Sequence, residues 1–121
     1  MTAVRWILRI VVAAIFLMAG GMKLAGAAQA VEMYDVIGIG QWFRYLTGII
    51  EVGSAVLLFV PSLTGLAAVL LACTMVGAII VHLTVLHSAP TGPVVLLCLT
   101  GTIAWLYRAR LTSLRAVSGP A

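Results

Sequence analysis

Four long apolar stretches, separated by short polar or proline-containing segments, constrain this chain more than any other feature. A bilayer hydrocarbon core about 30 Å thick requires about 20 apolar helical residues for each crossing. With 64% hydrophobic and only 8% charged residues, the 121-residue sequence is also far more apolar than a soluble core needs. We therefore expect an all-α polytopic membrane protein, a single domain over residues 1–121 built as an antiparallel four-transmembrane-helix bundle.

Turn-forming residues separate the apolar stretches. Pro61 ends the second stretch because proline lacks the amide hydrogen that a continuing helix requires. The segment between the first two stretches is too polar to cross a membrane, and its Val31, Tyr34, Ile37 spacing predicts a short interfacial helix. The spans are predicted at about 6–24, 43–60, 66–86 and 94–106.

The first apolar stretch also has features of a secretory signal, because Ala28-Gln29-Ala30 resembles a cleavage site. The stretch is long for the apolar region of a signal peptide. We expect a true first span.

Basic residues flank the outermost spans and predict the orientation of the chain. Cytoplasmic loops and ends of membrane proteins carry an excess of Lys and Arg. We therefore expect a multi-pass protein with both termini cytoplasmic, as an even number of spans requires. The same arginines, in a chain with a pI of about 9.7, are explained by orientation, and we expect no nucleic-acid partner. They are Arg5, Arg9, Arg108, Arg110 and Arg115.

Glu51 lies in the middle of the second apolar stretch and needs a specific explanation. A charged side chain at the bilayer centre costs about 2.5–3.5 kcal/mol on insertion scales, so it usually faces protein or a wet cavity and has a partner. Three basic residues are candidates for that partner: Lys23, Arg44 and His82. In the predicted topology all three lie near the outer ends of their spans.

This arrangement predicts a polar pocket that opens toward the outer leaflet. Glu51 follows Arg44 by seven residues, which places it about 10 Å deeper on the same helical face. Glu32 and Asp35, in the interfacial segment, would cover the pocket.

Two interpretations of this pocket remain open from the residues alone. The charges could form an interhelical tie that only holds the bundle together. Alternatively, a carboxylate, an ammonium and an imidazole that converge could bind a ligand or relay protons. His82 fits a packing role as well as a catalytic one, and His87 is expected to be a solvated loop residue.

Small residues and cysteines in the spans are expected to pack in the interior. Small residues let membrane helices approach closely. The candidates here are Gly48, Gly53, Ser54, Ala55, Ala72, Gly77, Ala78 and Gly101. Cys73 and Cys98 are expected to be buried thiols without a disulfide, because antiparallel helices would place them in opposite halves of the membrane. No zinc spacing, phosphate loop or nucleophile motif is present, and we expect no metal site.

Two segments together resemble the DoxX-like family of four-helix membrane proteins: LRIVVAAIFLMAGGMKL, and TGIIEVGSAVLLFVPSLTGLAAVLLACTMVGAIIVH. In the family pattern, the first helix ends in small residues and a lysine, the second carries a glutamate and a proline stop, and the third ends in histidine. Lys23, Glu51 and His82 match these positions. The resemblance covers residues 8–106 and implies a compact antiparallel bundle in the plasma membrane.

The resemblance implies a role without a fixed reaction, because relatives are linked to quinone-coupled sulfur oxidation, to oxidative-stress assemblies and to maturation of other membrane proteins. Our leading hypothesis is a subunit of a membrane redox system, without a redox cofactor of its own, whose pocket binds a quinone-like ligand or relays protons. The alternative is a non-enzymatic accessory or assembly subunit. Expected partners are the lipid bilayer and either other membrane subunits or further copies of the chain. A small transporter is less well supported, because no inverted repeat is visible.

Overall fold

The computed structural model describes residues 2–109, and these form five helices without a strand. The all-α prediction is therefore confirmed for this part of the chain. Arg110 and Arg115, which contributed to the predicted orientation, lie outside the described residues. The helices are α1 (Thr2–Ala25), α2 (Ala28–Ile37), α3 (Trp42–Leu57), α4 (Thr64–Thr84) and α5 (Thr91–Leu106).

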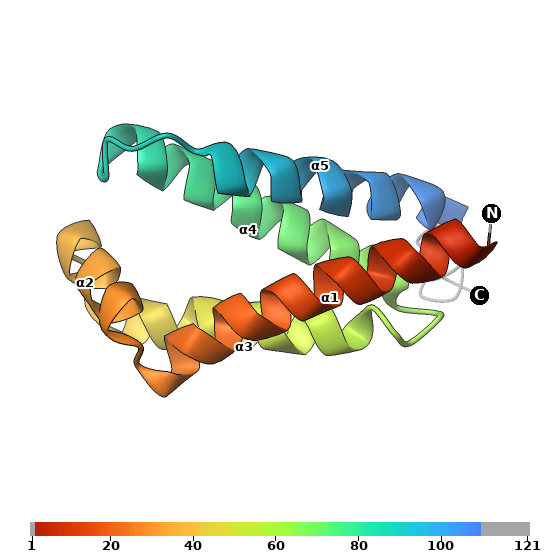
Figure 1. Cartoon of the computed structure of the whole chain (residues 1–121), viewed down its shortest axis with the longest axis horizontal. Helices are drawn as coiled ribbons and strands as arrows, with labels where there is room; N and C mark the ends of the chain where they lie inside the picture. The colour runs from red at the N-terminus through yellow and green to blue at the C-terminus, as the bar shows by residue number, and fades with distance from the viewer. Residues whose placement is uncertain (1, 110–121) are drawn as a thin grey trace, which may run out of the picture.

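The four long helices pack as two antiparallel pairs, α1 with α3 and α4 with α5 (Figure 1). Contacts between α3 and α4, and between α1 and α5, join the pairs into a closed ring. The N-terminus and the end of α5 lie at one end of the bundle, and α2 lies at the other. The two pairs diverge toward the α2 end. A tapered bundle of this kind has room for a cavity at its wide end.

The apolar core fills the narrow end, near the start of α1 and the end of α5. Val12 and Phe16 of α1, Leu71 of α4 and Ile103 of α5 are fully buried there. Small alanines from α3 and α4 complete the core and let the helices approach. The dry core therefore holds the two pairs together where they converge.

The turn between α3 and α4 is closed by side chains. The carbonyl of Leu58, one of the groups left unsatisfied at a helix C-terminus, accepts from the hydroxyl of Thr64 at 2.8 Å and from Arg9 Nη1 at 3.4 Å. Pro61 lies in this turn, as predicted. The first residue of α4 and the second turn of α1 therefore both fix the end of α3.

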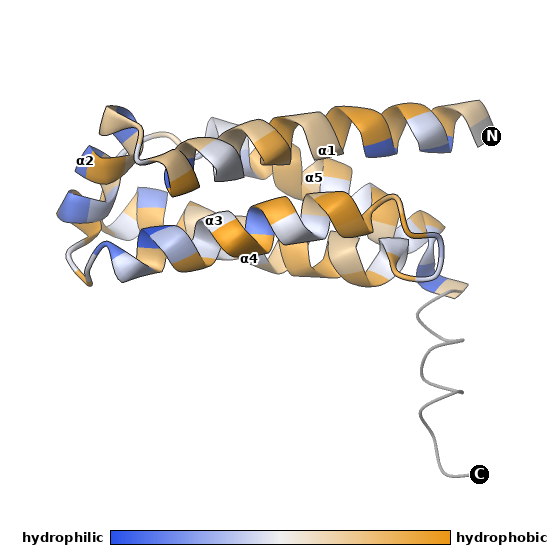
Figure 2. Cartoon of the chain, turned by 90° about the horizontal axis from the view of Figure 1, so that it is seen from below, coloured by the Kyte–Doolittle hydropathy of each residue, from blue (hydrophilic) through white to orange (hydrophobic). Residues whose placement is uncertain are grey.

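Two of the predicted spans are shorter than a full crossing requires. Helices α1 and α4 are long and apolar enough to span a bilayer by length and composition. Helices α3 and α5 have 16 residues each, because α3 ends before the Pro61 turn and α5 begins only after Pro90. Hydrophobic residues cover most of the long helices, whereas hydrophilic residues gather around α2 (Figure 2). The helices match the predicted order, and two candidate membrane spans are established.

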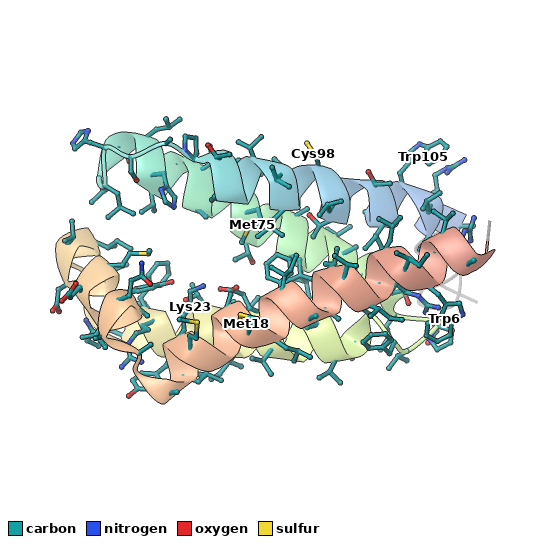
Figure 3. All side chains as sticks on the ribbon, viewed as in Figure 1. Trp6, Met18, Lys23, Met75, Cys98 and Trp105 are labelled. Carbon is teal, nitrogen blue, oxygen red and sulfur yellow. The ribbon has the colours of Figure 1, made fainter. Side chains whose placement is uncertain are left out.

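Tryptophans mark the narrow end of the bundle. Trp6 on α1 and Trp105 on α5 lie at this end and are 46% and 62% exposed (Figure 3). Trp6 stacks on Phe59 with ring centroids 6.3 Å apart. Exposed indole rings at a bundle end are typical of the interfacial aromatic belt of membrane proteins.

Candidate functional site

Close packing of two glycines brings α1 and α3 together beside the site. A Cβ atom added to Gly20 would lie 2.8 Å from Val52 Cγ2 and 3.0 Å from the Gly48 carbonyl oxygen. A Cβ on Gly48 would lie 3.0 Å from Leu24. No residue larger than glycine fits this contact without moving the helices. The prediction of close packing is therefore right for Gly48, and the sequence reading missed its partner, Gly20.

The same prediction is wrong for three other glycines. Cβ atoms added to Gly53, Gly77 or Gly101 would meet nothing within 4 Å. These positions face open space, so their small size serves no helix contact within the described chain. In a helix that is apolar on all sides, the sequence does not show which small residues face a neighbour.

Beside the glycine contact, Lys23 of α1 forms an ion pair with Glu51 of α3 through Nζ and Oε1. Only 2% of the Glu51 side chain and 19% of the Lys23 side chain are exposed. An isolated buried charge is far more costly than a paired one, so each residue requires the other. Lys23 is labelled in Figure 3 at the α2 end of α1. Among the three candidates that the sequence left open, Lys23 is the partner of Glu51.

Arg44 has a different position from the one expected. Its guanidinium donates through Nη1 to the backbone carbonyl of Lys23 and through Nε to Gln41 Oε1 at 2.7 Å. It also lies over the Tyr45 ring, 4.3 Å from the centroid. Arg44 therefore caps the C-terminus of α1, where unsatisfied carbonyls attract a cation. It does not line the cavity described next.

A cavity of about 440 Å³ lies at the wide end of the bundle, between the diverging helix pairs and α2. Most of its lining is apolar, and the polar side chains on it come from four helices. Such a composition, with a few convergent polar groups, is typical of small-molecule sites. The polar lining residues are Lys23, Gln29, Tyr34, Thr47, Glu51, Thr74 and His82.

Helix α2 covers the cavity with its apolar face. Met33, Tyr34 and Ile37 line the cavity, and Tyr34 Oη forms a hydrogen bond of 2.6 Å with Thr47 Oγ1 of α3. The expectation that Glu32 and Asp35 cover it is wrong, because both residues are exposed and neither lines the cavity. The short helix was predicted from the correct spacing, and that spacing marked the face that contacts α3.

His82 reaches the cavity from α4, as the sequence predicted, but it does not bond to Glu51. Its Nδ1 forms a hydrogen bond of 2.8 Å with Ser88 Oγ in the loop before α5. This bond orients the imidazole ring and occupies Nδ1. Only the other nitrogen, Nε2, therefore stays available to a ligand. His87 is exposed in the same loop, as expected, with a φ of 49°. Thus Lys23, Glu51 and His82 line one cavity, whereas Arg44 lies outside it at the C-terminus of α1.

The cysteine prediction is wrong in part. Cys73 and Cys98 are free, as expected, but both are exposed on the outer surface of α4 and α5. These helices are apolar around their whole circumference, so hydrophobic periodicity gives no indication of their inner face. Within residues 2–109, no group of three His, Cys, Asp or Glu side chains is placed to hold a metal ion.

Comparisons with known proteins identify a relative and a family. The chain is similar to a protein of Bacillus subtilis (strain 168) named "Putative oxidoreductase CatD", with 33% identity over 74 residues. The match covers 61% of this chain and spans about half the length of that relative, 55%. No solved structure matches the chain. A sequence profile described as the DoxX-like family matches residues 7–105, which include Lys23, Glu51 and His82, and the chain therefore belongs to the DoxX-like family of membrane proteins.

Proposed function

We propose that the four long helices cross the plasma membrane, with both termini cytoplasmic and α2 at the outer interface. Three features support this topology. Consecutive long helices are antiparallel, and the N-terminus lies at the same end as the close of α5. Arg5, Arg9 and Arg108 are at that end, where the positive-inside rule places basic residues. The cavity then opens in the outer half of the bilayer.

We propose further that this cavity binds the headgroup of a quinone-like ligand in a membrane redox system. The observation that carries the proposal is the buried Lys23–Glu51 pair on the wall of a cavity that is otherwise apolar. An interhelical tie alone needs no cavity beside it. A flat, lipid-soluble ring with two carbonyl oxygens fits the volume, the apolar lining and the few polar groups.

The polar groups have suitable chemistry for such a ligand. A quinone carbonyl accepts hydrogen bonds, and the ammonium of Lys23 and the imidazole of His82 are donors. Reduction to a quinol adds two electrons and two protons, and Glu51 is suited by type to exchange one of these protons. Tyr34 and Thr47 hold hydroxyl groups at the same wall, as a further donor or acceptor.

In this proposal the chain positions the quinone and exchanges its protons, and a partner subunit supplies the electrons. We therefore assign the chain as a subunit of a larger redox assembly rather than a complete oxidoreductase. The relative named as an oxidoreductase supports this assignment. Its whole activity is not carried over, because the match spans about half of its length.

Purification in mild detergent, followed by extraction and mass spectrometry of bound small molecules, tests the proposal. Wild-type protein should retain a quinone. Glu51→Gln should retain at least tenfold less quinone while the protein stays folded by circular dichroism. Glu32→Gln is the matched control, because it makes the same chemical change at an exposed carboxylate outside the cavity. It should retain the quinone at the wild-type level.

A non-enzymatic accessory subunit is the second candidate, and one observation favours it. An apolar surface groove of about 520 Å³ runs between α3 and α4, lined by residues such as Leu46, Ile50 and Leu70. Such a groove fits a helix of a membrane partner or of a second copy. A large partner that copurifies with wild type and Glu51→Gln alike, with no small molecule in either sample, would favour this function over quinone binding.

A further inference from the structure

Charged residues are divided between the two ends of the bundle. All three acidic residues of the sequence lie between positions 32 and 51, at or near the α2 end. The narrow end carries Arg5, Arg9 and Arg108. Within residues 2–109, no Asp or Glu side chain forms an ion pair with Arg5 or Arg9. These two arginines therefore lack a counter-charge among the described residues.

Arg9 is the least expected of these residues, because only 6% of it is exposed. Its guanidinium lies 4.0 Å from the centroid of the Trp6 ring and 5.6 Å from that of Tyr107. One long hydrogen bond, of 3.4 Å, joins Nη1 to the Leu58 carbonyl. Its Nε is buried and has no hydrogen-bond partner within residues 2–109. A buried donor without an acceptor costs about 1–3 kcal/mol, so the site is incomplete as it stands.

Arg5 approaches the same place from one turn earlier in α1. Its guanidinium lies 5.3 Å from the centroid of the Tyr107 ring, the ring that Arg9 also contacts. Its Nε is likewise buried without a partner among the described residues. Arg5 as a whole is only half-buried, so a rotation of its side chain can present Nε–H to a ligand. Two guanidinium groups with unused donors thus converge on one aromatic ring.

Aromatic rings alone do not compensate two converging cations. A cation–π contact contributes about 0.5–2 kcal/mol, and it leaves the N–H groups without acceptors. Orientation of the chain by positive charge requires arginines near a span end, but it does not require one of them to be buried. An oxyanion with several acceptor oxygens satisfies both the charge and the donors, and guanidinium groups bind phosphate in this way.

We propose that Arg5 and Arg9 form a binding site for the phosphodiester of an anionic phospholipid at the narrow end of the bundle. Arg5 makes the first contact with the headgroup, and Arg9 donates from the deeper position behind it. Trp6 and Trp105 place this end at the membrane interface, at the depth of lipid phosphates. Basic pockets on membrane proteins attract anionic headgroups by the same physics. This site is at the opposite end from the cavity and is independent of its function.

Native mass spectrometry of the full chain, released from detergent micelles and titrated with defined lipids, tests the site. Phosphatidylglycerol should bind more tightly than zwitterionic phosphatidylcholine. Removal of one guanidinium by Arg5→Gln should weaken phosphatidylglycerol binding about fivefold, the effect of one basic residue near a lipid surface. Arg9→Lys keeps the charge in the core but loses the planar fork, and it should weaken binding two- to fivefold without unfolding the bundle.

Arg108→Gln is the matched control, because it removes the same charge from the same end. Arg108 is exposed, follows the end of α5 and lies over the Trp105 ring of that helix, 4.0 Å from the centroid. It should change phosphatidylglycerol binding less than twofold. Equal effects of Arg5→Gln and Arg108→Gln would overturn the proposal in favour of diffuse attraction. A third arm uses inorganic phosphate: binding that Arg5→Gln abolishes, without preference for phosphatidylglycerol, would reject the lipid and identify a soluble anion.

Discussion

The contact between Gly20 and Gly48 gives a quantitative test of how the site is built. In Gly20→Ala, the new Cβ would lie 2.8 Å from Val52 Cγ2, 3.0 Å from the Gly48 carbonyl oxygen and 3.1 Å from Glu51 Cβ. Carbon atoms pack best at about 3.5–4.0 Å, so α1 and α3 must separate by roughly 0.5–1 Å. Glu51 is itself part of this contact, so the geometry of the Lys23–Glu51 pair depends on the same separation.

Two opposing effects set the size of the change. Overpacking of a tight contact costs about 1–3 kcal/mol. Replacement of a helical glycine by alanine raises the free energy of unfolding by about 0.5–1 kcal/mol, because alanine loses less backbone entropy on folding. We therefore expect Gly20→Ala to lower the free energy of unfolding by about 1–2 kcal/mol.

Reversible unfolding in mixed micelles, followed by circular dichroism, measures this difference. Gly21→Ala is the matched control, because Gly21 is the next residue of the same helix and an added Cβ there meets nothing within 4 Å. It should be neutral or stabilising by up to about 1 kcal/mol. If the two variants were equally stable, the close approach of α1 and α3 would not hold and our account of the ion pair would fail.

Three further outcomes follow from contacts of named side chains. Lys23→Met leaves the buried Glu51 carboxylate without a cation and should cost about 3 kcal/mol in the same unfolding assay, and Glu51→Gln in the same chain should recover most of the loss. Tyr34→Phe removes the hydroxyl that joins α2 to α3 and should cost about 1 kcal/mol, and hydrogen exchange should become faster in α2 but not in α4. Thr64→Val removes one of two donors to the Leu58 carbonyl and should cost only about 0.5–1 kcal/mol; a loss above about 2 kcal/mol would contradict the shared role of that carbonyl.

The sequence was sufficient to find the candidate site, because ionic groups are rare in apolar helices. Glu51 had to have a partner, and only a few cations could reach it. The choice among those cations was not predictable. Lys23 and Arg44 lie at the same level, and what separates them is the tight glycine contact and the need of α1 for a C-terminal cap. The glycine contact and the cap both depend on the relative position of two helices, and the sequence of neither helix specifies that position.

The orientation of the two C-terminal helices was equally beyond the sequence. A soluble helix reveals its inner face through polar residues on the other side, whereas α4 and α5 are apolar all round. The sequence therefore did not show whether Cys73 and Cys98 face the interior or the surface, and the prediction of buried thiols was wrong. Helix α2 behaved differently, because its mixed composition marked the Tyr34 face correctly.

The unequal helix lengths have a consequence for the surrounding bilayer. At 1.5 Å per residue, the 24 residues of α1 extend about 36 Å, whereas the 16 residues of α3 and of α5 extend about 24 Å each. In the proposed topology, a hydrocarbon core of about 30 Å meets hydrophobic mismatch beside the short helices, and these lie across the ring from each other. Lipids should thin locally on two opposite flanks, so the protein should prefer membranes with short acyl chains, and lipid composition becomes a means of adjusting the bundle.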